Sequence, residues 1–185
     1  MISWLAACGG SGGAVQTPEP SVTQSAAEPP AVIEGTSFLD VADGYSVQFP
    51  AGWTADDDAL SAGTLSLDTF FSPETIGEVQ PNVSVTCERL AVSNDLLTYY
   101  DNYKATVERF MATGFIETTG VVAGQPARLI SYQLTRESLT LAKTEAVLIG
   151  GDCAYRIALT APPGSEGQFR PLFDSFLASF DLIEG

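Results

Sequence analysis

Four apolar-patterned segments in the second half of the chain constrain its fold most strongly. Each is long enough for a strand, and only short breaks with Gly, Pro or polar turn residues separate them. Strands joined by such short turns pair antiparallel, because a parallel pair needs a crossover connection of about a dozen residues or more. The sequence therefore predicts an antiparallel meander over residues 115–122, 127–135, 139–149 and 153–161.

The first half contains a distinctive stretch, YSVQFPAGW, which begins at Tyr45. Its first five residues alternate between apolar and polar side chains, which is the pattern of a half-buried strand. Pro50 cannot donate to a strand ladder and should end that strand. Gly52 permits a tight turn, which places Trp53 to fold back onto the sheet. Further strands are expected at 37–41, 64–71 and 82–90.

Helical periodicity appears between residues 93 and 113. Apolar residues recur there at steps of three and four, which predicts one buried stripe on a helix. Ser93 or Asn94 can cap its start, and Gly114 is expected to end it. The stripe consists of Leu96, Tyr100, Tyr103, Val107 and Phe110.

A second helical stripe lies between residues 165 and 180. Ser165 and Gln168 have the spacing of a capping box, but Pro171 deletes one helix hydrogen bond, so we expect a firm helix only from about Pro171. Two helices with one apolar face each must cover a sheet. The predicted fold class is therefore α+β, with an antiparallel sheet of about six strands flanked by two main helices in one domain, residues 37–185.

Composition excludes several functions. Eight basic residues face 23 acidic ones, and the net charge of −15 argues against nucleic-acid binding. Histidine is absent, which excludes a Ser-His-Asp triad and every His-ligated metal site. The acidic run 56–58 lacks the ligand spacing of an EF-hand and is interpreted as a solvated loop. We predict no enzyme, cofactor or metal site; a hydrolase with paired carboxylates would need acidic residues that face one cleft.

The first eight residues, MISWLAAC, end in a motif that resembles the lipobox of bacterial lipoproteins, Leu5 to Cys8. The resemblance implies that the thiol of Cys8 carries a diacylglycerol and anchors the protein to a membrane of the cell envelope, outside the cytoplasm. Only seven residues precede Cys8, too few for a signal peptide, so we interpret 1–8 as its remnant, with the start misassigned or truncated. Residues 9–36 are rich in Gly, Pro and Ser and are predicted to be a disordered tether.

The chain also resembles the PsbP/DcrB-like group of small envelope, luminal or periplasmic domains. The order of elements over 37–182 agrees with that group, as do the 71–73 strand exit, the 82–85 strand, the 124–127 hairpin and the closing Ser179-Phe180. The resemblance implies an antiparallel sheet between helices in an α/β/α sandwich, and a non-enzymatic accessory or binding role. Its most specific residues, interpreted as structural, are Tyr45, Phe49, Pro50, Gly52 and Trp53.

Two cysteines, Cys87 and Cys153, remain in the domain, and each continues the apolar face of its strand. They could form a disulfide or remain as two buried thiols, because sequence alone does not reveal which strands are neighbours.

Three functions are compatible with these features. The first is a lipid-anchored accessory domain that binds a protein or membrane complex. The second is a small-ligand carrier, with a pocket between the sheet and helix 93–113 lined by Tyr99, Tyr100 and Tyr103. The third is a structural spacer of the envelope with no specific partner.

Overall fold

The computed structural model describes residues 35–91, 95–110 and 112–183. The predicted lipid-attachment residue Cys8 and nearly all of the predicted tether lie outside this range, although the first strand begins at Gly35, two residues before the expected start of the domain. The elements are β1 (Gly35–Asp40), β2 (Tyr45–Pro50), β3 (Thr54–Ala62), β4 (Leu65–Phe71), β5 (Asn82–Arg89), α1 (Leu96–Arg109), β6 (Ala112–Val122), β7 (Gln125–Arg136), β8 (Leu139–Gly150), β9 (Cys153–Ala161), α2 (Glu166–Ser179) and β10 (Asp181–Leu182).

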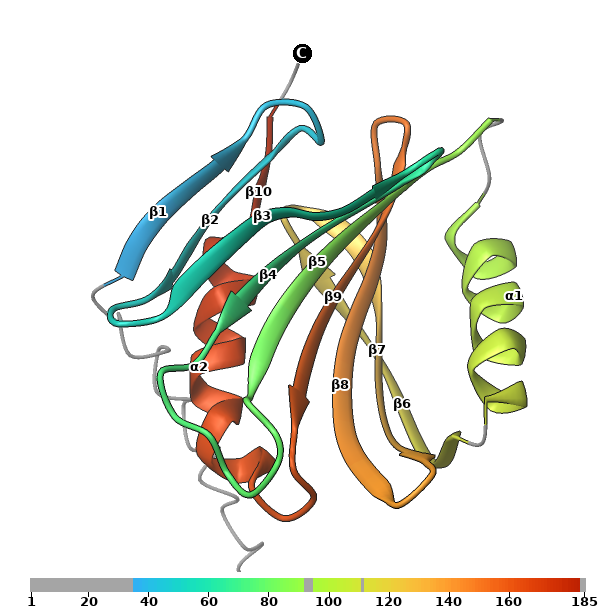
Figure 1. The fold of residues 1–185 in the computed structure, drawn as a ribbon. Helices are drawn as coiled ribbons and strands as arrows, with labels where there is room; N and C mark the ends of the chain where they lie inside the picture. The colour runs from blue at the N-terminus through green and yellow to red at the C-terminus, as the bar shows by residue number, and fades with distance from the viewer. Residues whose placement is uncertain (1–34, 92–94, 111, 184–185) are drawn as a thin grey trace, which may run out of the picture.

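The described strands form two antiparallel sheets rather than the single sheet expected from the sequence (Figure 1). The larger sheet has seven strands in the order β3-β4-β5-β9-β8-β7-β6, and the smaller has the order β1-β2-β10. The strand of the YSVQFPAGW stretch, β2, belongs to the smaller sheet because its partners are the preceding hairpin strand β1 and the C-terminal β10. The predicted meander is confirmed as β6 to β9, each strand paired with the next.

The larger sheet has one junction between strands far apart in sequence, where β5 pairs with β9. The pairing runs from Asn82 opposite Thr160 to Arg89 opposite Cys153. A disulfide joins Cys87 to Cys153 across this junction, 66 positions apart in the chain, with 5.4 Å between their Cα atoms. Of the two alternatives that the sequence left open, the structure has the disulfide.

The two helices cover opposite faces of the larger sheet (Figure 1). Helix α2 packs Phe169, Phe173 and Phe176 into the main core. The inner face of β2, the β5 residues Val83, Val85 and Cys87, and the odd-numbered residues of β9 complete this core. Helix α1 contacts β6, β7 and β8 and contributes Tyr99, Tyr100 and Val107 to a second, smaller core. Neither helix is long and apolar enough to cross a membrane, among the residues that the structure describes.

Helix α1 is shorter than predicted. Asp95 caps its start by accepting a hydrogen bond from the Thr98 amide at 2.9 Å, whereas the predicted caps Ser93 and Asn94 lie outside the described residues. The apolar stripe stops at Val107, since Phe110 is 67 % exposed. Gly114 does not end the helix but lies in β6, with a φ of +70° at a shift in strand register.

Helix α2 begins at Glu166, five residues before Pro171, so the delayed start was a wrong prediction. Pro171 has no N–H to donate to the Gly167 carbonyl four residues earlier. Because Gly167 is exposed, water can bind that carbonyl, so the helix tolerates the missing hydrogen bond. The predicted capping box does not form, because the Ser165 hydroxyl donates to the Pro162 carbonyl at 2.7 Å instead.

The acidic run 56–58 was also wrongly assigned to a loop. It lies within β3, an edge strand of the larger sheet. Its pairing with β4 shifts in register between Asp56 and Leu60. Such an irregularity with acidic residues protects an edge from pairing with other chains.

We expect the disulfide to stabilise the fold by about 2–4 kcal/mol, because it closes a long loop in the unfolded chain. Replacing both Cys87 and Cys153 by Ala should lower the free energy of unfolding by this amount, measured by urea denaturation. The Cys8→Ser protein, denatured without reductant, should show no free thiol in a thiol assay. Two reactive thiols per chain would contradict the bond.

Candidate functional site

The residues of the YSVQFPAGW stretch occupy structural positions. Tyr45, Phe49 and Pro50 are buried. Gly52 lies in an exposed turn with a φ of +83°, a backbone angle that residues with a side chain rarely adopt. This turn lets the Trp53 amide donate to the Pro50 carbonyl at 3.2 Å and brings the half-buried Trp53 ring against the main core, as predicted.

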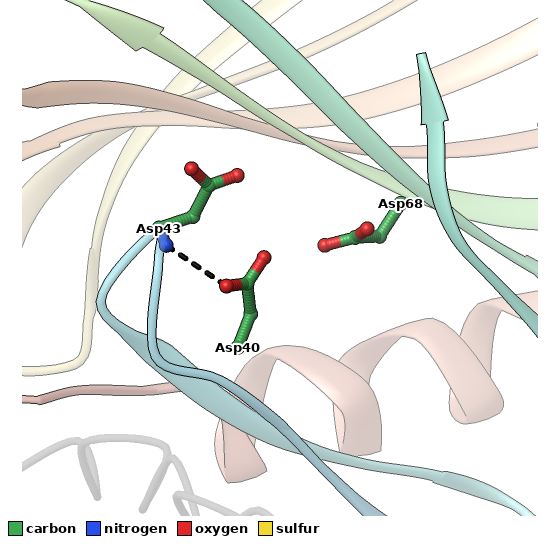
Figure 2. Close-up of side chains that lie close together, drawn as sticks. All are labelled: Asp40, Asp43 and Asp68. Carbon is green, nitrogen blue, oxygen red and sulfur yellow. Dashed lines mark hydrogen bonds between the residues drawn. The ribbon is translucent and has the colours of Figure 1, made fainter. Parts of the chain in front are cut away.

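The Tyr45 side chain leads to an acidic cluster that the sequence analysis did not predict, formed by Asp40, Asp43 and Asp68 (Figure 2). Asp40 ends β1, Asp43 lies in the turn before β2, and Asp68 lies in β4. One carboxylate oxygen from each residue lies within 4.8 Å of the others, and all three side chains are buried. The cluster therefore forms where the smaller sheet meets the larger one.

Protein donors bind the oxygens of this cluster. The Tyr45 hydroxyl donates to Asp68, and the Asp43 amide donates to Asp40 Oδ1 at 2.9 Å. The Ser66 hydroxyl donates to Asp43, and Arg89 Nη2 lies 3.3 Å from Asp43 Oδ1.

These contacts decide what the cluster can do chemically. Carboxylate oxygens are the ligands of hard cations such as Ca²⁺, so the donor set suits that class of metal. The arrangement also serves the fold, because it ties the β1–β2 hairpin to β4 and β5 through Tyr45, Ser66 and Arg89. The absence of a metal site stays a prediction. The groove described next is not lined by these three carboxylates.

The predicted ligand-lining tyrosines lie near a groove between α1 and the strands β5 and β9. Tyr99 and Tyr103 line a cavity of about 410 Å³, but Tyr100 does not. Tyr100 points toward β6, where its hydroxyl donates to Glu117 Oε2 at 2.9 Å. The cavity is lined by Glu88, Leu90, Tyr99, Asn102, Tyr103, Thr106 and Arg156.

Two glutamates accept hydrogen bonds from the hydroxyls of the groove's tyrosines. Tyr99 donates to Glu88 Oε2 at 2.8 Å. Tyr103 donates to one oxygen of the buried Glu145, and Tyr132 donates to the other at 2.7 Å. Lys143 Nζ lies 3.4 Å from the same Glu145 carboxylate and supplies a compensating positive charge.

Arg156 of β9 also lines the groove and lies against Tyr103. Its guanidinium carbon lies 4.8 Å from the centre of the Tyr103 ring, within cation–π distance. Its Nε atom is buried and has no hydrogen-bond partner among the described residues. Burial alone lowers the pKa of this guanidinium, but the surrounding tyrosines and glutamates raise it further than burial lowers it, so Arg156 stays charged.

Comparisons with known proteins agree on the fold. The structure is similar to cyanobacterial PsbP (CyanoP) from Synechocystis, with a TM-score of 0.60 and 17 % identity over 85 % of this chain and 98 % of that chain. PA94, a Pseudomonas aeruginosa protein of unknown function, matches with a TM-score of 0.54 and 16 % identity over 78 % and 94 % of the two chains. LpqN of Mycobacterium tuberculosis, which is involved in cell envelope biogenesis, matches with a TM-score of 0.52 and 9 % identity over 82 % and 86 %.

No family model matches the sequence, and no curated protein matches it significantly. At identities this low, structural similarity establishes the fold and not the activity. The described domain therefore has the PsbP-like α+β fold that the sequence resemblance implied.

The tyrosines of the cluster and the groove make the fold sensitive to alkaline pH. Burial is the largest cause that raises the pKa of all six tyrosines in the chain, and it raises that of Tyr155 to about 12. Unfolded tyrosine titrates near pH 10. The folded state therefore holds these protons more tightly, so this stabilisation is complete below about pH 10 and is lost as the pH rises above it.

Absorbance at 295 nm during a pH titration should consequently show no phenolate near pH 10 while the circular dichroism stays native. In urea, all six tyrosines should ionise near pH 10. Several tyrosines that ionise reversibly near pH 10 in the folded protein would contradict the burial described here.

Proposed function

We propose that this chain is a lipid-anchored, non-enzymatic accessory domain of the bacterial cell envelope that binds a protein or membrane complex. The observation that carries the proposal is the PsbP-like fold, which matches CyanoP over 98 % of that chain. The likeness to LpqN, involved in cell envelope biogenesis, supports an envelope location. The disulfide supports an extracytoplasmic location, because disulfides persist mainly in oxidising compartments.

The exposed edge of the larger sheet is the surface that we assign to a protein partner. Strand β6 ends the sheet opposite β3 (Figure 1). It is largely exposed, with Ile116 68 % and Val121 72 % exposed. An edge strand presents unpaired backbone groups, to which an extended segment of another protein can add. Both edge strands have a register shift, but β3 carries the acidic run 56–58 whereas β6 has a single acidic residue, Glu117, which makes β3 the poorer template. The net charge of −15 favours a partner with a basic surface.

Carriage of a small ligand is the second candidate function. The groove beside α1 favours it, because a cavity of about 410 Å³ lies within the usual range of small-molecule sites, roughly 300–1,000 Å³.

The anchor predicts a change of location. Cys8→Ser should move the protein from the membrane fraction to the soluble fraction, because the thiol that carries the lipid is lost. Fractionation of cells that express the full gene measures this, with Ser11→Ala as the control that should stay on the membrane. A Cys8→Ser protein that remains membrane-bound would sink the lipoprotein assignment.

The partner can be sought from a defined position on β6. A photo-crosslinking residue at Ile116 should capture one partner in cells in stoichiometric amount, identified by mass spectrometry after affinity purification. The same residue at Leu60, exposed on the opposite edge strand β3, is the matched control and should capture far less. Equal capture from both edges would contradict the assignment to β6. No partner from either position, with the protein folded and abundant, would favour the ligand carrier or the spacer.

A further inference from the structure

We propose that the groove beside α1 binds a small carboxylate with a flat apolar body, and that Arg156 holds its anionic group. This inference rests on the second candidate function, the ligand carrier, and is independent of the partner proposed for β6. It names the ligand class and the residue that recognises it.

The first step is that most polar groups of the groove already have partners. The hydroxyls of Tyr99 and Tyr103 donate to glutamates, and the Thr106 hydroxyl donates to the Asn102 carbonyl at 3.0 Å. Arg156 differs, because it lines the groove while no described residue accepts a hydrogen bond from its guanidinium, the buried Nε included. A buried charged donor costs stability unless it finds an acceptor. A ligand that completes this site must therefore bring acceptor oxygens.

The second step concerns the charge of that ligand. The groove and its immediate surroundings contain two cations, Arg156 and Lys143, and two acidic residues, Glu88 and Glu145. A ligand with a single negative charge disturbs this balance less than a phosphate dianion does. The net charge of −15 on the chain also repels a dianion more strongly than a monoanion. A carboxylate also matches the planar fork of a guanidinium, which can donate to both of its oxygens.

The third step concerns the body of the ligand. Leu90 and the side chains of Tyr99 and Tyr103 give the cavity apolar and aromatic walls. The cation–π contact with the Tyr103 ring helps to hold the Arg156 guanidinium beside these walls. A flat apolar group fits beside these rings, because aromatic rings pack favourably in offset or edge-to-face arrangements.

The test uses the full chain with Cys8→Ser and follows the arginine side-chain Nε–H signals by ¹⁵N NMR. The probe is benzoate, and benzamide is its uncharged analogue of the same shape. The Arg156 signal, assigned with Arg156→Lys, should shift and saturate with benzoate, while benzamide should bind at least about tenfold more weakly.

Matched variants separate the groove from general surface binding. Arg156→Gln should abolish saturable benzoate binding. Arg128→Gln should leave it unchanged, because Arg128 also lies over a tyrosine ring, Tyr100, at 5.7 Å but does not line the groove. Thr106→Phe should fill the cavity and weaken benzoate binding while Arg156 stays intact. Because Thr106 is exposed on α1, this variant should fold, and it tests the site even if Arg156→Gln does not fold.

Three results would overturn the inference. Equal binding of benzoate and benzamide would show that Arg156 does not recognise the anionic group. The carrier function would then remain, with an uncharged apolar ligand. Binding of neither probe would overturn the carboxylate site, while the carrier function would still rest on the cavity alone. Benzoate binding that Thr106→Phe leaves unchanged would place the probe on the surface and not in the groove.

Discussion

The pairing of β5 with β9 is the contact on which the rest of the structure depends. It joins the β3–β5 unit to the β6–β9 meander, and helix α1 lies in the chain between them. Closing this long loop costs conformational entropy, and the disulfide across the junction reduces that cost by restricting the unfolded chain. The same register sets Arg156 opposite Thr86 and Glu88 opposite Ala154, so the junction also places the two charged residues of the groove on one face.

The parts of the fold that follow from local pattern were predictable from the sequence. The meander and both helices were found because short turns and apolar periods are local signals. The second sheet was not found, because β2 pairs with β10 from the far end of the chain.

The candidate site was predictable only on its helical side. Tyr99 and Tyr103 stood out because a helix presents residues three and four positions apart on one face. Arg156 gave no such signal, because a polar residue between Tyr155 and Ile157 is typical of any half-exposed strand. The acidic cluster was missed as well, although the Asp40 to Asp43 spacing around a turn was visible. Its third member, Asp68, joins only through packing between the two sheets.

The acidic cluster and Arg156 differ in how completely the protein binds their polar atoms. The carboxylates of Asp40, Asp43 and Asp68 accept hydrogen bonds from several segments, which ties the β1–β2 hairpin to the larger sheet. A buried polar network in which every group has a hydrogen-bond partner makes the fold more rigid. A buried charged donor without an acceptor lowers the stability of the fold. Arg156 is such a donor, and it lines a cavity open to a small molecule.

The exposed edge of β6 lies at the far end of the sheet order from β5, two strands beyond β8. A partner at the edge proposed above would therefore leave the groove near the centre of the sheet accessible.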